Sequence, residues 1–135
     1  MKLIIYLVLI VFLFTACSTT PISDRKSFIL IPMSQEILLG KQAYKSALKN
    51  LKNSDSNYLT KLLRRVGNRI AKVSHLPKLD WEFRLIDSNE QNAFALPGGK
   101  VAVYTGMLEI CKNEAGLATV LSHEIAHVIA RHGAQ

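Results

Sequence analysis

A pair of histidines four residues apart, near the end of the chain, constrains its fold more than any other feature. His123 and His127 enclose Glu124 within a stretch of Leu, Val, Ile and Ala residues. Residues four apart on an α-helix lie one turn apart and point in nearly the same direction, so both imidazoles can reach one metal ion. Zinc accepts neutral imidazole nitrogens at about 2.0–2.1 Å. The pattern therefore predicts an α-helix that supplies two zinc ligands.

Glu124 follows His123 directly, so it lies about 100° further round the same helix. A carboxylate there can address a water molecule on the metal without being a ligand itself. Zinc lowers the pKa of a bound water from about 15.7 to near 7, and a carboxylate can take its proton as the water attacks a peptide carbonyl. The pattern thus predicts peptide-bond hydrolysis with Glu124 as general base. The alternative is an apolar helix in which these three residues coincide by chance.

A catalytic zinc site also needs a third protein ligand. A metzincin would carry glycine at position 130 and histidine at position 133, where this chain has Ala130 and Gly133. Only eight residues follow His127. The residues alone therefore leave the third ligand of the site unidentified.

Four stretches share their pattern with a known family. Residues 123–132 (HEIAHVIARH), 92–99 (NAFALPGG), 101–106 and 113–115 resemble metallopeptidase family forty-eight, the gluzincins that include HtpX, the CAAX prenyl proteases and the mitochondrial Oma-type protease. The resemblance covers about residues 90 to 133. It implies a zincin-type fold with one Zn2+ in each active site, and a catalytic domain that continues past residue 135.

The resemblance also implies where the rest of the site lies. The family's third ligand is a glutamate on a later helix, which the resemblance places beyond residue 135, so neither Glu109 nor Glu114 is expected to bind the metal. Residues 93–104 are expected to line the cleft, with an exposed strand edge that holds a substrate peptide by strand addition. The implied substrate-binding residues are Asn92, Ala93, Phe94 and Ala95. The alternative for this stretch is a plain structural hairpin.

Three other polar residues have less definite expectations. Arg131 and His132 recur in the family pattern without an assigned role. His132 has two alternative expectations. It contacts the substrate or the glutamate ligand on the later helix, or it is an ordinary surface histidine. His75 is predicted to be a loop residue and not a ligand.

The first residues have the pattern of a targeting segment. Lys2 precedes an unbroken apolar run over residues 3–14, which as a helix rises only about 18 Å and is shorter than the roughly 20 residues that span a bilayer. A signal peptide over residues 1–16 fits better. Small residues then lead into Cys17, as in a bacterial lipoprotein lipobox, although Phe14 stands where leucine is usual. An ordinary signal peptide is the alternative.

Cleavage before Cys17 would make it the lipidated N-terminus. Cys111 would then have no partner within the chain, so no structural disulfide is expected. Ser18 follows the cysteine, and by resemblance to lipoproteins of Gram-negative bacteria this implies the outer membrane. We therefore predict a membrane contact through a lipid anchor.

The net charge of +7 comes from 17 basic and 10 acidic residues. Many of the basic residues lie on segments with helical apolar spacing, where a solvated helix face is expected. Attraction to anionic lipid is a second possibility. Aromatic residues are not interleaved with the basic ones, so no nucleic-acid partner is predicted.

Two helices are predicted in the first half of the domain. Ser34 is the expected N-cap of a helix that runs to about Lys52, and a break at residues 53–55 separates it from a second, strongly periodic helix. The apolar positions of the first helix are Ile37, Tyr44, Leu48 and Leu51. Those of the second are Leu59, Leu62, Leu63, Val66, Ile70 and Val73.

Extended patterns follow. Residues 81–86 alternate as a half-buried strand, residues 87–91 form a loop, and residues 92–105 predict a hairpin around a Pro-Gly-Gly corner. A short helix over residues 106–111 and a final helix opened by Asn113 complete the pattern. The fold class is therefore α+β: helices, a small antiparallel sheet or hairpin, and the active-site helix. Residues 33–135 form the N-terminal part of a peptidase domain, and residues 17–32 form a tether from Cys17.

The function predicted from these features is a zinc-dependent endopeptidase on the periplasmic face of a bacterial envelope. Its substrates would be peptides or misfolded envelope proteins, in protein quality control. The main alternative is a truncated, non-catalytic lipoprotein that lacks the third zinc ligand and serves as a binding module. A third reading is a lipid-anchored structural protein with a chance motif, which predicts no zinc.

Overall fold

The computed structural model describes residues 17–19, 26–28 and 31–134, and the predicted signal peptide at residues 1–16 lies outside them. Its helices and strands are β1 (Cys17–Thr19), β2 (Lys26–Phe28), α2 (Met33–Ala47), α3 (Asn57–Lys72), β3 (Glu82–Ile86), β4 (Ala93–Leu96), β5 (Lys100–Tyr104), α4 (Thr105–Cys111), α5 (Glu114–Ile129) and the 3-10 turn η1 (His132–Ala134). The predicted α+β class is confirmed.

The main sheet has the order β3-β5-β4, with β5 in the centre. β4 and β5 form the predicted antiparallel hairpin, and its corner places Gly98 and Gly99 at φ angles of 87° and 77°. Only glycine adopts such angles without strain. β3 pairs with β5 in parallel, aligning Phe83 with Val101. The sheet is therefore mixed and not wholly antiparallel.

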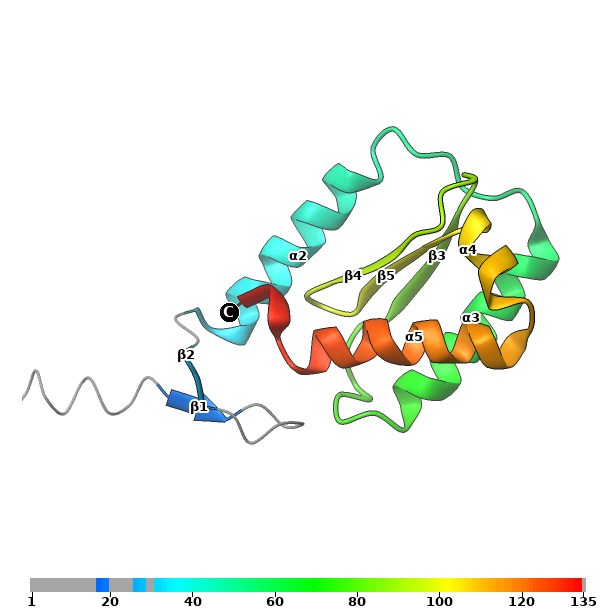
Figure 1. Cartoon of the computed structure of the whole chain (residues 1–135). Coiled ribbons are helices and arrows are strands. Elements are labelled where there is room, and N and C mark those ends of the chain that lie inside the picture. Colours follow the sequence, from blue (N-terminus) through cyan, green and yellow to red (C-terminus); the bar gives the residue numbers. More distant parts are fainter. Residues whose placement is uncertain (1–16, 20–25, 29–30, 135) are drawn as a thin grey trace, which may run out of the picture.

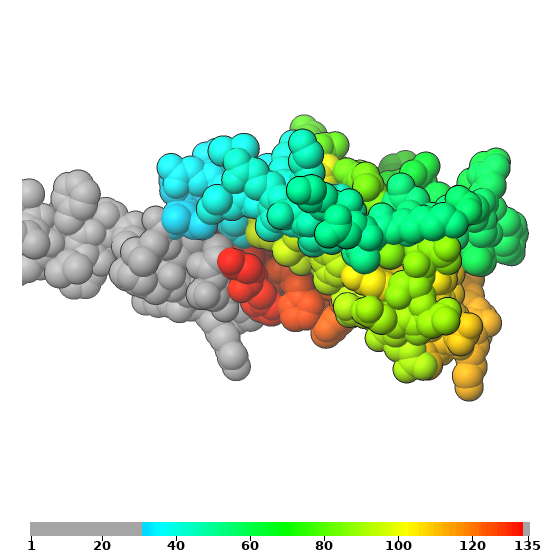
Figure 2. Space-filling model, turned by 90° about the horizontal axis from the view of Figure 1, so that it is seen from above, coloured from blue at the N-terminus to red at the C-terminus, as the bar shows by residue number. Residues whose placement is uncertain are grey.

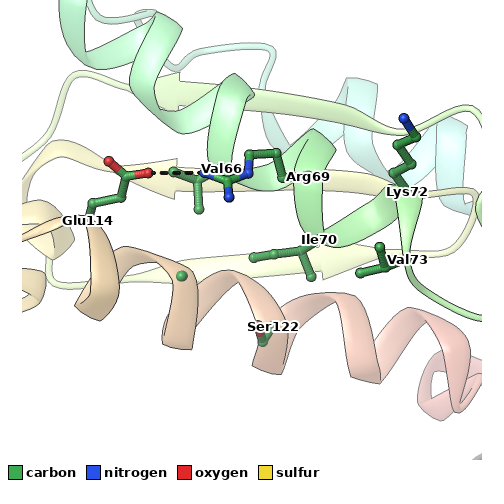
Figure 3. Close-up of a pocket in the computed structure, with 8 residues that line it drawn as sticks. Val66, Arg69, Ile70, Lys72, Val73, Glu114 and Ser122 are labelled. Carbon is green, nitrogen blue, oxygen red and sulfur yellow. Dashed lines mark ion pairs between the residues drawn. The ribbon is translucent and has the colours of Figure 1, made fainter.

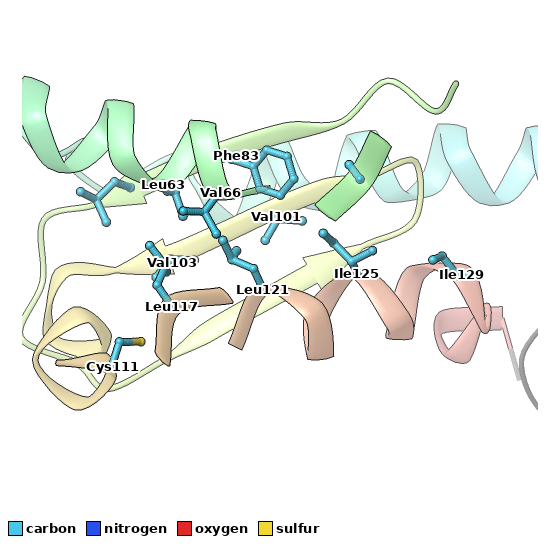
Figure 4. Close-up of a cluster of buried hydrophobic side chains, with 12 residues drawn as sticks. Leu63, Val66, Phe83, Val101, Val103, Cys111, Leu117, Leu121, Ile125 and Ile129 are labelled. Carbon is cyan, nitrogen blue, oxygen red and sulfur yellow. The ribbon is translucent and has the colours of Figure 1, made fainter. Parts of the chain in front are cut away.

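Helices cover both faces of this sheet (Figure 1). α3 and α5 pack together on one face, while α2 packs on the other against β4 and β5. Successive residues of β5 alternate between the two cores: Val101 belongs to the α3 and α5 side, and Ala102 belongs to the α2 side. Figure 4 shows the larger core. Its labelled residues include Leu63, Val66, Phe83, Val103, Leu117, Leu121 and Ile125.

The two long helices of the larger core begin at side-chain caps. Ser56 accepts a hydrogen bond from the Leu59 backbone N–H, and Asn113 accepts one from Gly116. Such caps satisfy backbone donors that have no partner inside the helix. The predicted opening of the last helix at Asn113 is confirmed, which fixes where α5 starts and hence which of its residues face the sheet.

Three boundaries differ from the predictions. α2 begins after Pro32, not at a Ser34 cap, because the Pro32 carbonyl accepts the first backbone hydrogen bonds of the helix. It ends at Ala47, short of Lys52. Val73 is 84% exposed, since α3 ends one residue earlier and the chain turns away. β1 and β2 both lie within residues 17–32, the predicted tether.

Gly40 lies in the interior of α2, where glycine normally weakens a helix. The structure gives its reason: a Cβ at this position would overlap the carbonyl of Pro97, at the hairpin corner. Glycine thus lets α2 approach the sheet closely.

Within the part of the chain that is described, no helix has the length and apolar character needed to cross a membrane.

Candidate metal centre

The packing of α5 determines which of its residues face solvent. Leu121 and Ile125 are almost fully buried against the sheet and α3. His123 lies two residues after Leu121, about 200° round the helix, and is therefore directed away from the core. His127 shares its side of the helix and is half-buried. The same apolar stripe that fixes α5 in the fold thus presents both histidines outward.

The two histidines converge as their spacing predicts. His123 Nε2 and His127 Nε2 lie 2.9 Å apart, and the rings meet edge to face with centroids 4.4 Å apart. Two nitrogens that bind one tetrahedral zinc ion at its usual bond lengths lie about 3.3 Å from each other. A small rotation of either ring reaches that separation, so the donor chemistry and the spacing of this pair fit a zinc ion.

Glu124 projects beside the pair and is partly buried. Burial raises its pKa, because a carboxylate loses hydration there, while His123, His127 and the backbone of Ala95 act in the opposite direction. A carboxyl group with a raised pKa is a stronger base once ionised. The surroundings of Glu124 therefore suit a residue that accepts a proton.

Glu124 and His127 line a cleft of about 350 Å³. Its lining also includes β4 with the hairpin corner, residues 93–97, and the residues Arg131 and His132 after α5. The expectation that residues 93–104 line the cleft is thus too broad, since β5 is buried in the centre of the sheet. Asn92 is exposed at the start of β4 and is not among the lining residues.

β4 is an edge strand, with β5 on one side only. The Asn92 carbonyl accepts a hydrogen bond from the Tyr104 N–H. In an antiparallel ladder the inward-bonding residues alternate with outward-facing ones, so the backbone groups of Ala93 and Ala95 point away from β5. The cleft wall therefore presents backbone groups that β5 does not use, and one of them, the Ala95 N–H, is already engaged by the Glu124 carboxylate.

The part of the chain described here contains no group of three His, Cys, Asp or Glu side chains able to hold a metal ion. Glu114 lies at the opposite end of α5, where both carboxylate oxygens bond to Arg65. Glu109 is exposed on α4, and His75 is exposed in the loop after α3. None of the three lines the cleft that Glu124 and His127 line.

The structure gives Arg131 a partner that the sequence did not indicate. Its Nε donates to Glu36 Oε2 at 2.6 Å, and the side chains are only 15% and 6% exposed. Glu36 is one of two buried charged residues in the described chain, and no local pattern marks it, because its partner is 95 residues away. Figure 2 shows the C-terminal turn, in red, against the start of α2, in cyan.

A second, larger hollow of about 720 Å³ lies between α3 and α5 (Figure 3). Four of its eight lining residues are aliphatic, and none is a histidine or a cysteine. Its one acidic residue, Glu114, is engaged by Arg65, with Arg69 further away at 3.9 Å. This hollow therefore offers no chemistry comparable to the cleft at His127.

Two histidines and a glutamate on one helix, beside an edge strand, define a metallopeptidase-like arrangement, and the comparisons identify the family. Residues 58–135 match the model of peptidase family M48, so the chain belongs to this family. The resemblance predicted from the motifs is confirmed.

Several curated relatives are metalloendopeptidases by name. The mitochondrial metalloendopeptidase OMA1 of Schizosaccharomyces pombe is 41% identical over 128 residues, which are 93% of this chain and 38% of that protein. Human OMA1 is 31% identical over 136 residues, covering 96% of this chain and 26% of its own length. The beta-barrel assembly-enhancing protease of Escherichia coli is 38% identical over 74 residues, 55% of this chain and 15% of that protein. The chain thus spans less than half of these relatives.

Proposed function

We propose that this chain is the N-terminal part of the catalytic domain of a zinc-dependent endopeptidase. The observation that carries the proposal is the convergence of His123 Nε2 and His127 Nε2 to 2.9 Å, with His127 and Glu124 lining a cleft that the edge strand β4 also lines. Membership of family M48 supports the same reaction class. The third ligand, a glutamate, is expected beyond residue 135.

His123 and His127 would hold the zinc ion through Nε2. Zinc bound there supplies a Lewis acid that polarises the peptide carbonyl and lowers the pKa of water. Glu124 then acts as general base: its carboxylate accepts the proton of the attacking water and can pass it to the nitrogen of the departing amine. Its raised pKa suits both proton transfers.

The substrate would bind as an added strand on β4. The outward-facing N–H and carbonyl of Ala93 and the carbonyl of Ala95 can pair with an extended peptide, while the Ala95 N–H bonds to Glu124. Such pairing would lay the scissile bond along the cleft beside Glu124 and His127. Because backbone groups make the contact, this mode favours unfolded or extended segments of many sequences, as expected of an enzyme that removes misfolded proteins.

The reaction is tested by comparing two glutamate variants of the full-length protein. Glu124→Gln should bind zinc normally but lose about 10²–10⁴-fold in peptide cleavage, since only the proton acceptor is removed. Glu109→Gln, at an exposed position on α4, is the matched control and should cleave normally. Activity that survives in Glu124→Gln would refute the assigned role. A full-length protein without zinc or cleavage would instead support the non-catalytic binding module.

The strand-edge contact is tested by Ala93→Pro. Proline removes one outward-facing N–H without breaking a bond between β4 and β5, and edge strands tolerate it. The KM for an extended peptide should rise while the melting temperature stays near that of the wild type. An unchanged KM would mean that the hairpin is only structural.

We also propose that Cys17 carries a lipid and anchors the protein at the periplasmic face of the outer membrane. The apolar run at residues 3–14 and the small residues before Cys17 support this. Cys17→Ser should abolish labelling by a fatty-acid analogue and release the protein from the membrane fraction. Continued labelling of this variant would exclude lipidation at Cys17.

A further inference from the structure

Three imidazoles form a chain at the end of α5. His127 stands in the middle: its Nε2 lies 2.9 Å from His123 Nε2, and its Nδ1 lies 2.6 Å from His132 Nδ1. A neutral imidazole carries one N–H and one lone pair. The hydrogen bond at Nδ1 therefore decides whether Nε2 is free to bind a metal.

The position of His132 depends on a sharp turn. α5 ends at Ile129, and Arg131 adopts a φ of 54°, a left-handed conformation that residues other than glycine and asparagine seldom occupy. This turn reverses the chain so that His132 comes back against His127, which it follows by five residues. A residue other than glycine at this point suggests that its side chain is required.

The Arg131 side chain fixes that turn from two directions. Its Nε donates to Glu36 Oε2 at 2.6 Å, and its Nη2 donates to the Ile31 carbonyl at 3.1 Å. Glu36 lies in the first turn of α2, and Ile31 lies two residues before that helix begins. Because the ion pair is buried, it holds the turn more firmly than an exposed pair would.

We propose that His132 is a positioning residue for the metal centre, accepting a hydrogen bond from His127 Nδ1–H so that His127 Nε2 is left free and aimed at the metal. The Arg131–Glu36 ion pair sets the turn that makes this contact. The inference rests on the proposed function, in which His123 and His127 bind zinc. A histidine ligand commonly donates its second N–H to an outer partner, which fixes the tautomer and the ring orientation.

The geometry separates this role from two others. His132 meets Nδ1, on the side of the His127 ring away from Nε2, so in this arrangement it is not the third ligand of the same ion. The position of a surface histidine without a role would not be fixed by a buried ion pair, whereas the turn before His132 is held by the pair of Arg131 with Glu36. The proposed role requires one direction of this hydrogen bond: a donor at position 132 would move the His127 proton onto Nε2 and block the metal.

Zinc affinity of the full-length protein, measured by competition with a chromophoric chelator, tests the proposal. His132→Leu removes the acceptor and should raise the zinc dissociation constant about 10–100-fold. His132→Asn has a similar size and can place its amide oxygen where Nδ1 was, so it should stay within a few-fold of wild type. His75→Leu is the matched control at an exposed loop and should change nothing.

Two further measurements keep the outcome decisive. Metal-free His132→Leu should melt at the wild-type temperature, which a purely structural role would not allow. Nitrogen NMR of the metal-free wild type should find the His127 proton on Nδ1. Wild-type zinc affinity in His132→Leu, alongside loss of zinc in His127→Ala, would overturn this inference alone. Undiminished zinc binding in His127→Ala would overturn the proposed function and this inference with it.

Discussion

The two ends of α5 each carry an arginine–carboxylate ion pair, yet the pairs differ in almost every other respect. At the N-terminal end, Arg65 holds Glu114 through two hydrogen bonds of 2.8 and 2.9 Å, and the side chains are 53% and 44% exposed. At the C-terminal end, Arg131 and Glu36 meet through a single carboxylate oxygen at 2.6 Å and are nearly enclosed. The better geometry thus belongs to the exposed pair.

The difference shows what each pair contributes. Glu114 lies in the first turn of α5, where the helix dipole favours a negative charge. Its attraction to the exposed Arg65 is weakened by solvent screening. Removal of Arg65 leaves a hydrated carboxylate, whereas removal of Glu36 leaves a buried guanidinium without its counter-charge. The exposed pair supports a helix end, and the buried pair supports the turn at Arg131, whose residues line the cleft.

The largest expected effect comes from breaking the buried pair. Glu36→Gln leaves the Arg131 charge uncompensated in a buried position, so the free energy of unfolding should fall by about 3–5 kcal/mol. Chemical denaturation of the full-length protein measures this. Zinc affinity should fall as well, because the turn that places His132 loses its support.

A double variant separates charge from packing. Glu36→Leu combined with Arg131→Met replaces both charges by apolar side chains, which is often close to neutral for a buried pair. It should therefore regain much of the stability lost in Glu36→Gln without restoring the zinc affinity. If Glu36→Gln were as stable as the wild type, the contrast between the two ends of α5 would be lost.

An intermediate effect is expected at the N-terminal cap. Asn113 Oδ1 accepts a hydrogen bond from the Gly116 N–H at 2.9 Å. Asn113→Ala should lower the free energy of unfolding by about 1 kcal/mol, whereas Asn113→Asp keeps an acceptor and should be nearly neutral. Because this end of α5 is remote from the histidines, zinc affinity should not change. A loss of zinc binding in Asn113→Ala would show that the two ends are coupled.

The sequence was sufficient for those parts of the fold that depend on local chemistry. α3 and α5 follow from helical spacing of residues such as Leu63 and Leu121, and the hairpin follows from two glycines that must adopt positive φ. The parallel pairing of β3 with β5, which aligns Glu82 with Lys100, has no local sequence pattern. The sequence of a strand does not show which other strand it pairs with or in which direction. Val73 continued the periodic pattern, but the helix had already ended.

The site divides in the same way. His123, Glu124 and His127 share one helix, so their spacing alone predicts their convergence. Arg131 and Glu36 belong to opposite ends of the described domain, and only the packing of α2 brings them together. The role of His132 depends on that packing, so it was not predictable from the motif in which it lies.

The smallest effect is expected from the exposed pair, and its pH dependence has a definite sign. The Arg65 hydrogen bonds lower the pKa of Glu114 below its usual value, and the more distant Arg69 acts in the same direction. A lowered pKa in the folded state stabilises the protein above the unfolded pKa of about 4.3, and this stabilisation is lost as the pH falls through the folded value. Arg65→Met should therefore melt slightly below wild type at neutral pH and low salt.

The same comparison in acid or in high salt isolates the electrostatic part. The melting temperatures of Arg65→Met and wild type should converge at a pH where Glu114 is protonated, and also at high ionic strength, because solvent-exposed charges are screened. Lys61→Met, another exposed basic position on α3, should show no such convergence. The buried Arg131–Glu36 pair is expected to respond much less to salt. Equal salt sensitivity at both ends would mean that burial does not distinguish the two pairs.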